Sequence, residues 1–271
     1  MLRVARAALF ATVPAELVFA VLLVSGVSLP LAVVAVAETA VVAVFVLEAV
    51  TAFLLFRAAR RGGADRRKAS RATYEQLVPR QVRRIMGFDL KGMVSLALWV
   101  TRRRHGVPGG ATAVSYSGAQ TLTMLIFLGA MVVELVAAEV LLRAFGAPAG
   151  LRAVVLVADG YTVLIVLAVI AACVTRPHVV ADDEVRIRYG AFFDLRVPCD
   201  RIAAVRQARN LNESGSVKVD GDRLAVAVSS QTNLVLELTE PITAIRPLGR
   251  HAEVRTIRLF ADDPAAALAA L

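Results

Sequence analysis

The sequence predicts a bundle of four transmembrane helices joined to an all-β domain that a C-terminal helix closes. Composition is the first observation behind this prediction. Of the 271 residues, 58% are hydrophobic and only 20% are charged, which is too apolar for one water-soluble globule. The second observation is a change of pattern after Arg176, where long apolar runs give way to short runs of alternating apolar and polar residues.

Four stretches are long and apolar enough to cross a bilayer, which takes about 20 helical residues. They are residues 7–27, 31–56, 122–142 and 151–174. The short, uncharged connection at residues 28–30 joins the first two into a hairpin, and the last two form a second hairpin. A cleavable signal peptide is the alternative for the first run, but Glu16 in its middle argues against it.

Charge orients these spans. Residues 57–120 hold fourteen Lys and Arg against three acids, which gives this loop a net charge of +11, whereas residues 176–271 hold thirteen of each sign. Because basic loops stay on the cytoplasmic side, we expect a multi-pass protein of the cell membrane with both termini in the cytoplasm. The expected divisions are residues 1–58, 59–117, 118–175 and 176–271: a hairpin, a basic loop, a second hairpin and a cytoplasmic β-domain.

Six of the 22 acids fall inside the predicted spans. An ionised carboxylate at the centre of a spanning helix costs about 2.5–3.5 kcal/mol, so such residues usually face a bundle interior and have partners. No Lys, Arg or His lies in the interior of a span, since Arg152 flanks the loop at the start of the fourth. The counter-charge must therefore come from a proton, a cation, water or a helix-end residue such as Arg143. The six acids are Glu16, Glu38, Glu48, Glu134, Glu139 and Asp159.

The two hairpins resemble each other. Aligning Glu16-Leu17-Val18 with Glu134-Leu135-Val136 also brings Glu38 onto Asp159 after a slightly longer loop. Such a parallel repeat occurs in transporters with midplane sites. The leading hypothesis is therefore that Glu16, Glu38, Glu134 and Asp159 bind a proton or a hard cation of unknown identity, in transport or ion-linked regulation, with Glu48 and Glu139 at other depths.

Three alternatives stay open. The acids can be protonated and hydrogen-bond across helices to groups such as Thr39; the chain can be a membrane-anchored scaffold; or it can be an intramembrane enzyme that acts on a lipid or isoprenoid through carboxylate acid catalysis. A di-iron centre is disfavoured because no span holds a histidine. No Walker loop, G-x-G-x-x-G, HExxH, G-x-S-x-G or CxxC occurs, so we expect no cofactor.

The basic loop contains an amphipathic helix. From Gln81 to Val100 apolar residues recur at helical spacing, and Trp99 and then Arg102, Arg103 and Arg104 follow. An aromatic anchor beside a basic cluster favours docking at anionic headgroups; the alternative is a core helix packed on the C-terminal domain. Residues 57–70 look like a solvated linker. Nucleic acid is not expected as a partner, because the basic run lacks interleaved aromatic residues.

Alternation in the C-terminal region predicts a hairpin over residues 185–197 and further strands at 202–207, 216–219, 224–228, 233–239 and 254–260. A helix follows, with Asp263 as its N-cap and Pro264 at its first position. We expect these strands to form a meander that the helix closes.

Three segments carry a resemblance: VRIRYGAFFDLRVPCDRIAAVRQ, TNLVLELTEPI and VRTIRLFADDPAAALAAL. They resemble bacterial PH-like domains attached to membrane helices, as in uncharacterised integral membrane proteins of high-GC bacteria. The resemblance implies a PH-like barrel with no catalytic motif. Because this region is neutral, we expect residues 176–271 to contact another protein, a second copy of the chain or the membrane-facing loop rather than a phosphoinositide.

Overall fold

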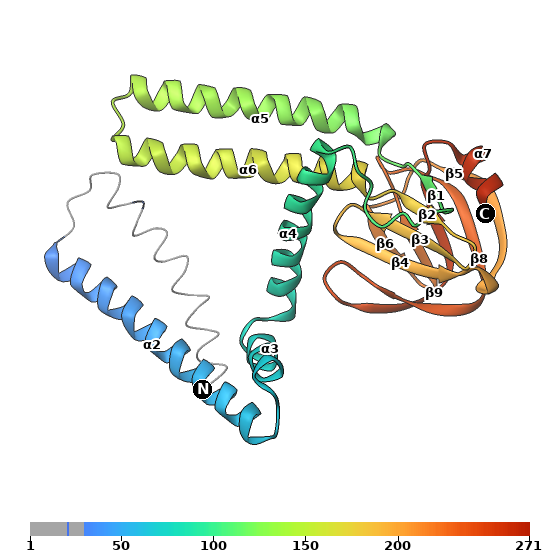
Figure 1. The fold of residues 1–271 in the computed structure, drawn as a ribbon. Coiled ribbons are helices and arrows are strands. Elements are labelled where there is room, and N and C mark those ends of the chain that lie inside the picture. Colours follow the sequence, from blue (N-terminus) through green and yellow to red (C-terminus); the bar gives the residue numbers. More distant parts are fainter. Residues whose placement is uncertain (1–20, 22–29) are drawn as a thin grey trace. The chain divides into compact units, whose positions relative to one another are not determined.

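Three helices of the described chain are long and apolar enough to cross a membrane: α2 (Leu31–Arg61), α5 (Gly118–Ala144) and α6 (Ala149–Thr175). The computed structural model describes residues 21 and 30–271 (Figure 1), so the first predicted span, with Glu16, lies outside the described residues. Apolar side chains along the three helices are largely exposed, as at Phe127 and Val157, which is the surface that lipid would cover. This is consistent with a membrane protein.

Two helices occupy the segment between α2 and α5: α3 (Arg66–Leu77) and α4 (Arg80–Val100). The amphipathic helix is thus confirmed, but the linker predicted over 57–70 is wrong. Helix α2 continues to Arg61, the chain turns at Gly62 and at Gly63 with a φ of +83°, and α3 begins at Arg66. Ala, Arg and Lys are good helix formers, so polarity alone did not mark a linker here.

The β-domain consists of two sheets. The first has the order β1-β2-β3-β4, from strands Thr112–Val114, His178–Val180, Glu184–Tyr189 and Phe193–Pro198. The second has the order β5-β8-β9-β7-β6, from strands Ile202–Asn210, Thr232–Ile245, His251–Leu259, Arg223–Val226 and Val217–Asp220. A short 3₁₀ turn, η1 (Cys199–Arg201), links the sheets, and α7 (Pro264–Ala270) ends the domain.

Both sheets share one hydrophobic core. Ile187 of β3, Val197 of β4, Leu236 of β8 and Ile257 of β9 are all fully buried in it, and Ala267 of α7 packs against them. The predicted cap of α7 is confirmed, since the Asp263 carboxylate accepts a hydrogen bond of 2.9 Å from the Ala266 N–H. The C-terminal helix therefore closes this core.

The second sheet is not the simple meander that the alternation predicts. Strand β7 pairs with β9 in parallel, while β8 and β9 form the long antiparallel hairpin. Strand β8 also runs through Pro241, which lacks the N–H needed for a ladder hydrogen bond. The register shift between Glu237 and Ile242 places this proline where pairing is interrupted.

The β-domain is discontinuous in sequence. Strand β1 precedes α5, whereas β2 follows α6, and the two pair through Thr112–Val180 and Val114–His178. The chain divides into two compact units, residues 1–83 with 134–160 and residues 84–133 with 161–271. The second unit contains the β-domain together with the ends of α5 and α6 that adjoin it.

A carboxylate of the β-domain caps the start of α5. Both oxygens of Asp262 lie within hydrogen-bond distance of the Gly118 N–H, at 2.9 and 3.1 Å, and the Asp262 N–H donates to the Ser115 carbonyl at 2.8 Å. Because the first N–H groups of a helix have no partner within it, and its N-terminus carries partial positive charge, this contact stabilises α5 where it leaves the domain.

Replacing Asp262 with Ala is expected to lower the free energy of unfolding by about 1 kcal/mol, the usual cost of losing a helix cap. Faster amide exchange at the start of α5 should accompany the loss, measured by hydrogen–deuterium exchange in detergent. Asp262→Asn, which keeps one acceptor oxygen, is the control and should retain most of the protection. Equal protection in Asp262→Ala and the parent protein would contradict a capping role.

Candidate membrane-interface site

Helix α4 crosses α6 near the end of that helix. A Cβ added at Gly92 would lie 3.2 Å from the Cβ of Ala168, so the glycine lets the two backbones approach closely. Beside the crossing, the rings of Phe88 and Phe192 meet edge to face with centroids 5.2 Å apart. Figure 1 shows α4 running across α6 rather than along it. The crossing joins α4, the end of α6 and the β3–β4 turn.

Arg176, the first residue after α6, fixes this crossing. Its Nε donates to the Ser95 hydroxyl at 3.0 Å, and its Nη1 lies 3.3 Å from Nδ1 of His105. Arg176 is only 7% exposed, and this burial is the main reason that its pKa is lowered. The end of α6 is thus held by side chains of α4 and of the loop that follows α4.

Arg188 of β3 holds the same loop. Its guanidinium is buried; Nη1 donates to the His105 carbonyl at 2.8 Å and Nη2 to the Gly106 carbonyl at 3.0 Å. Burial, together with the positive charge of Arg186, lowers the pKa of Arg188 to about 10. Asp194 supplies the nearby negative charge and accepts a hydrogen bond of 2.7 Å from Arg186 Nε. The loop is therefore clamped between α4 and the first sheet.

The predicted interface residues lie at the start of this clamped loop. Trp99 is 36% exposed, and Arg102, Arg103 and Arg104 are all exposed. Helix α4 ends in a Schellman pattern, with N–H bonds from Arg102 to the Trp99 carbonyl and from Arg103 to the Leu98 carbonyl. Arg102 has a φ of +54°, a conformation that favours glycine.

Buried polar groups connect the start of α5 and the residues before it to the β-domain. The Tyr116 ring is fully buried and stacks on His178 with centroids 4.6 Å apart, and its hydroxyl accepts a 2.6 Å bond from the Gly190 N–H. From α5, Gln120 accepts a bond of 3.2 Å from the Tyr189 hydroxyl. Burial raises the pKa of Tyr116 well above its usual value, so Tyr116 stays neutral.

His178 is held in one tautomer. Its Nδ1 accepts a bond of 3.0 Å from the Arg188 N–H, so the proton sits on Nε2, which donates to the Phe260 carbonyl at 3.1 Å. Protonation of Nδ1 would create an N–H that points at the backbone N–H of Arg188. Burial lowers the pKa of His178 to about 4, and the charge of Arg188 acts in the same direction.

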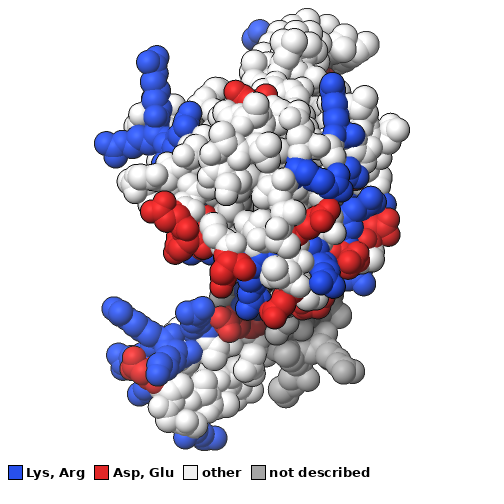
Figure 2. Space-filling view, turned by 90° about the vertical axis from the view of Figure 1, so that its right-hand side faces the viewer, with Lys and Arg blue, Asp and Glu red and all other residues white. Residues whose placement is uncertain are grey.

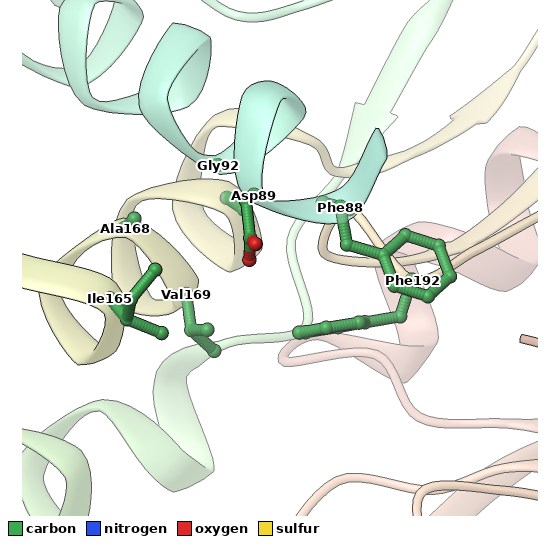
Figure 3. Close-up of a pocket in the computed structure, with 9 residues that line it drawn as sticks. Phe88, Asp89, Gly92, Ile165, Ala168, Val169 and Phe192 are labelled. Carbon is green, nitrogen blue, oxygen red and sulfur yellow. The ribbon is translucent and has the colours of Figure 1, made fainter. Parts of the chain in front are cut away.

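A small apolar cavity of about 70 Å³ lies beside the helix crossing (Figure 3). Phe88 and Asp89 come from α4, Ile165 and Val169 from α6, and Phe192 from the β3–β4 turn. Asp89 is the only ionisable residue of its lining. The cavity therefore offers no acid–base pair, and its volume suits a few methyl groups rather than a whole substrate.

The predicted intramembrane acids lie elsewhere. Glu38 and Glu48 are in α2, Glu134 is in α5 and Asp159 is in α6, while Glu16 lies outside the described residues. Within the described part of the chain, no three His, Cys, Asp or Glu side chains form a group that could hold a metal ion. The cation site stays a prediction.

Glu139 does have an identified partner. Arg152 of α6 binds its carboxylate with Nε, at 3.1 Å, and with Nη2. Arg143 was the helix-end partner predicted for the acids, but for Glu139 that partner is Arg152. The pair joins the ends of α5 and α6 next to their connecting turn at residues 145–148.

On the face shown in Figure 2, basic and acidic side chains are interspersed rather than segregated. The β-domain contains ion pairs between partly or fully exposed side chains, such as Arg206 with Glu237 at 3.2 Å and Arg196 with Glu184 at 3.4 Å. Exposed pairs of this kind contribute little stability. Each pair does, however, neutralise its arginine, so these arginines do not add to a basic patch for anionic headgroups.

The sequence pattern did not predict the clamp, that is, the contacts of Arg176 and Arg188 with α4 and the loop after it. Arg188 occupies an alternate position in a strand, next to Arg186, and alternation alone indicates solvent exposure for both. The one indication of these contacts in the sequence was Arg176-Pro177-His178 directly after an apolar run. The chain matches no family model, no curated protein and no solved structure. The PH-like resemblance therefore stays a prediction.

His178 makes stability depend on pH. Its pKa is about 4 in the folded chain, against 6.5 for a histidine in water, so the unfolded chain binds the proton first as the pH falls. Stability is full above pH 6.5 and declines toward pH 4, by about 3 kcal/mol in total. Thermal unfolding in detergent should show this slope, and it should flatten in His178→Gln. The exposed His251→Gln is the control; a slope that survives in His178→Gln would contradict the assignment.

The helix crossing is tested by two glycines of α4. Gly87→Ala meets no atom within 4 Å and is expected to raise stability by about 1 kcal/mol, because alanine favours helix. Gly92→Leu carries the same propensity gain but must push α4 away from Ala168, so it should lower the melting temperature in detergent. A Gly92→Leu protein as stable as Gly87→Ala would show that the crossing is loose.

Proposed function

We propose that this protein is a membrane-anchored scaffold that holds its β-domain at the cytoplasmic face of the membrane for a protein partner. Two buried arginines carry the proposal: Arg176 directly after α6 and Arg188 of β3. Arg176 binds α4 and Arg188 binds the following loop, so the β-domain follows α6 without a flexible linker. A domain attached in this way presents a fixed surface.

We further propose that the β-domain is PH-like. Two sheets around one core and a C-terminal helix packed into that core favour this assignment. The parallel pair of β7 and β9 and the contribution of β1 from before α5 depart from a simple antiparallel meander. The interspersed surface charges favour a protein over a phosphoinositide as the ligand of this domain.

Edge strand β5 is the place where a partner would bind. It lies at one end of the second sheet, and its Gln207 is exposed. Leu211, which follows the strand, is 53% exposed. An edge strand offers free N–H and C=O groups to an incoming strand, and a nearby apolar side chain adds area that is removed from water on binding.

Site-specific photo-crosslinking in cells tests the proposal. A photoreactive amino acid at Gln207 or Leu211 is expected to give one discrete crosslinked protein, either a second copy or another chain. The same amino acid at Phe45 of α2, which is 61% exposed, is the control and should give lipid adducts instead. If Gln207 and Leu211 give no protein adduct, the scaffold proposal fails.

The predicted cation site is tested in parallel. With a scaffold function, purified protein in liposomes should show no cation or proton flux, and Glu38→Gln and Asp159→Asn should melt at the same temperature as the parent across a panel of divalent cations. Saturable stabilisation by one cation that both variants abolish would instead establish the carboxylate site, and the scaffold would cease to be the best-supported function.

A further inference from the structure

We propose that α4 lies in the plane of the membrane interface and that Arg102, Arg103 and Arg104 bind anionic lipid headgroups there. The proposal rests on the membrane anchoring proposed above, but not on the identity of any protein partner. It commits to one occupant for the exposed apolar side of α4, which is the bilayer surface itself.

The depth of the crossing is the first argument. About 20 helical residues cover the hydrocarbon core of roughly 30 Å, and in α6 the stretch from Ala149 to Ala168, where α4 crosses, has this length. Burial changes at the same point, because Val157 is 70% exposed whereas Ile170 and Ala172 are 1% exposed. Helix α4 therefore meets α6 where the hydrocarbon ends.

The exposed side of α4 is the second argument. Gly92 and Ser95 are buried at the crossing, while Met86, Leu90 and Val94 recur at four-residue spacing on the other side and are 46–68% exposed. A helix that runs across a spanning helix at the hydrocarbon edge can bury such a stripe in the interface. Because this apolar stripe lies at the hydrocarbon edge, lipid is the partner that we expect to cover it.

Charge complementarity is the third argument. The three arginines follow directly after this helix and point away from the protein, since all three are exposed. Their place is fixed, because the His105 N–H donates to the Thr175 carbonyl at 2.8 Å and Arg188 holds the His105 carbonyl. Arg102 also occupies a φ of +54°, where glycine costs less, so its charge is placed here at a cost in backbone strain.

Trp99 is the only tryptophan of the chain and lies one turn before the arginines, so its fluorescence reports on the interface. The full-length protein is placed in nanodiscs of phosphatidylcholine alone or mixed with phosphatidylglycerol. Quenching of Trp99 is measured with acrylamide in the water and with acyl-brominated phosphatidylcholine in the bilayer. Brominated lipid should quench in both discs, and acrylamide quenching should be about threefold weaker in the anionic discs.

The test variant is the triple change R102G, R103Q and R104Q. The glycine removes charge while relieving the backbone at residue 102, so the fold should be no less stable, and the difference between the two lipids should disappear. The control R66Q, R67Q and K68Q removes equal charge from exposed positions of α3 and should preserve the difference.

Three results would overturn the proposal. The first is acrylamide quenching that is equal in the two lipids for the parent protein. The second is a lipid difference that survives in the R102G, R103Q and R104Q variant. The third is a Trp99 shielded from acrylamide and untouched by brominated lipid, which would mean that protein covers α4. None of these results affects the crosslinking from β5, so failure here is separate from failure of the scaffold function.

Discussion

The buried guanidinium of Arg188 is the interaction on which the arrangement around the end of α6 depends. It is 2% exposed, and it donates to the carbonyls of residues 105 and 106 in the loop after α4. A buried charge is costly unless hydrogen bonds and counter-charge compensate it. Here the loop carbonyls provide the hydrogen bonds and Asp194 the charge, so loop and sheet stabilise each other only when both are in place.

Close packing around this clamp likewise depends on both partners of each contact. A Cβ on Gly106 would lie 2.9 Å from Arg188 Nη2, and a Cβ on Gly118 would lie 2.9 Å from the Asp262 carboxylate. Because glycine has no side chain, the charged group can reach the backbone at each of these two positions. The β-domain is thus attached to α4, α5 and α6 by separate polar contacts, each of which satisfies backbone groups that a helix end or a loop leaves free.

Sequence reasoning succeeded where periodicity is long or a cap is local. The three described spans, the amphipathic helix and the helix capped by Asp263 all follow from spacing and from single-residue preferences. Prediction from the sequence failed where strands pair with segments that are distant in the sequence. The three-residue strands β1 and β2 carry no readable alternation, and β8 continues through Pro241 because a register shift accommodates it. Arg188 looked exposed because alternation cannot report that a loop covers one position of a strand. The acids of the spans are located, but whether they act together stays a prediction.

The discontinuity of the β-domain has a topological consequence. Strands β1 and β2 pair directly, through Thr112–Val180 and Ala113–Val179, so they occupy the same aqueous compartment. Helices α5 and α6 are the only long apolar segments between them, and the number of membrane crossings between two points on one side is even. Either both helices span the bilayer or neither does. A chain in which only one of the two helices had crossed would hold β1 and β2 on opposite sides of the membrane, and its first sheet could not form.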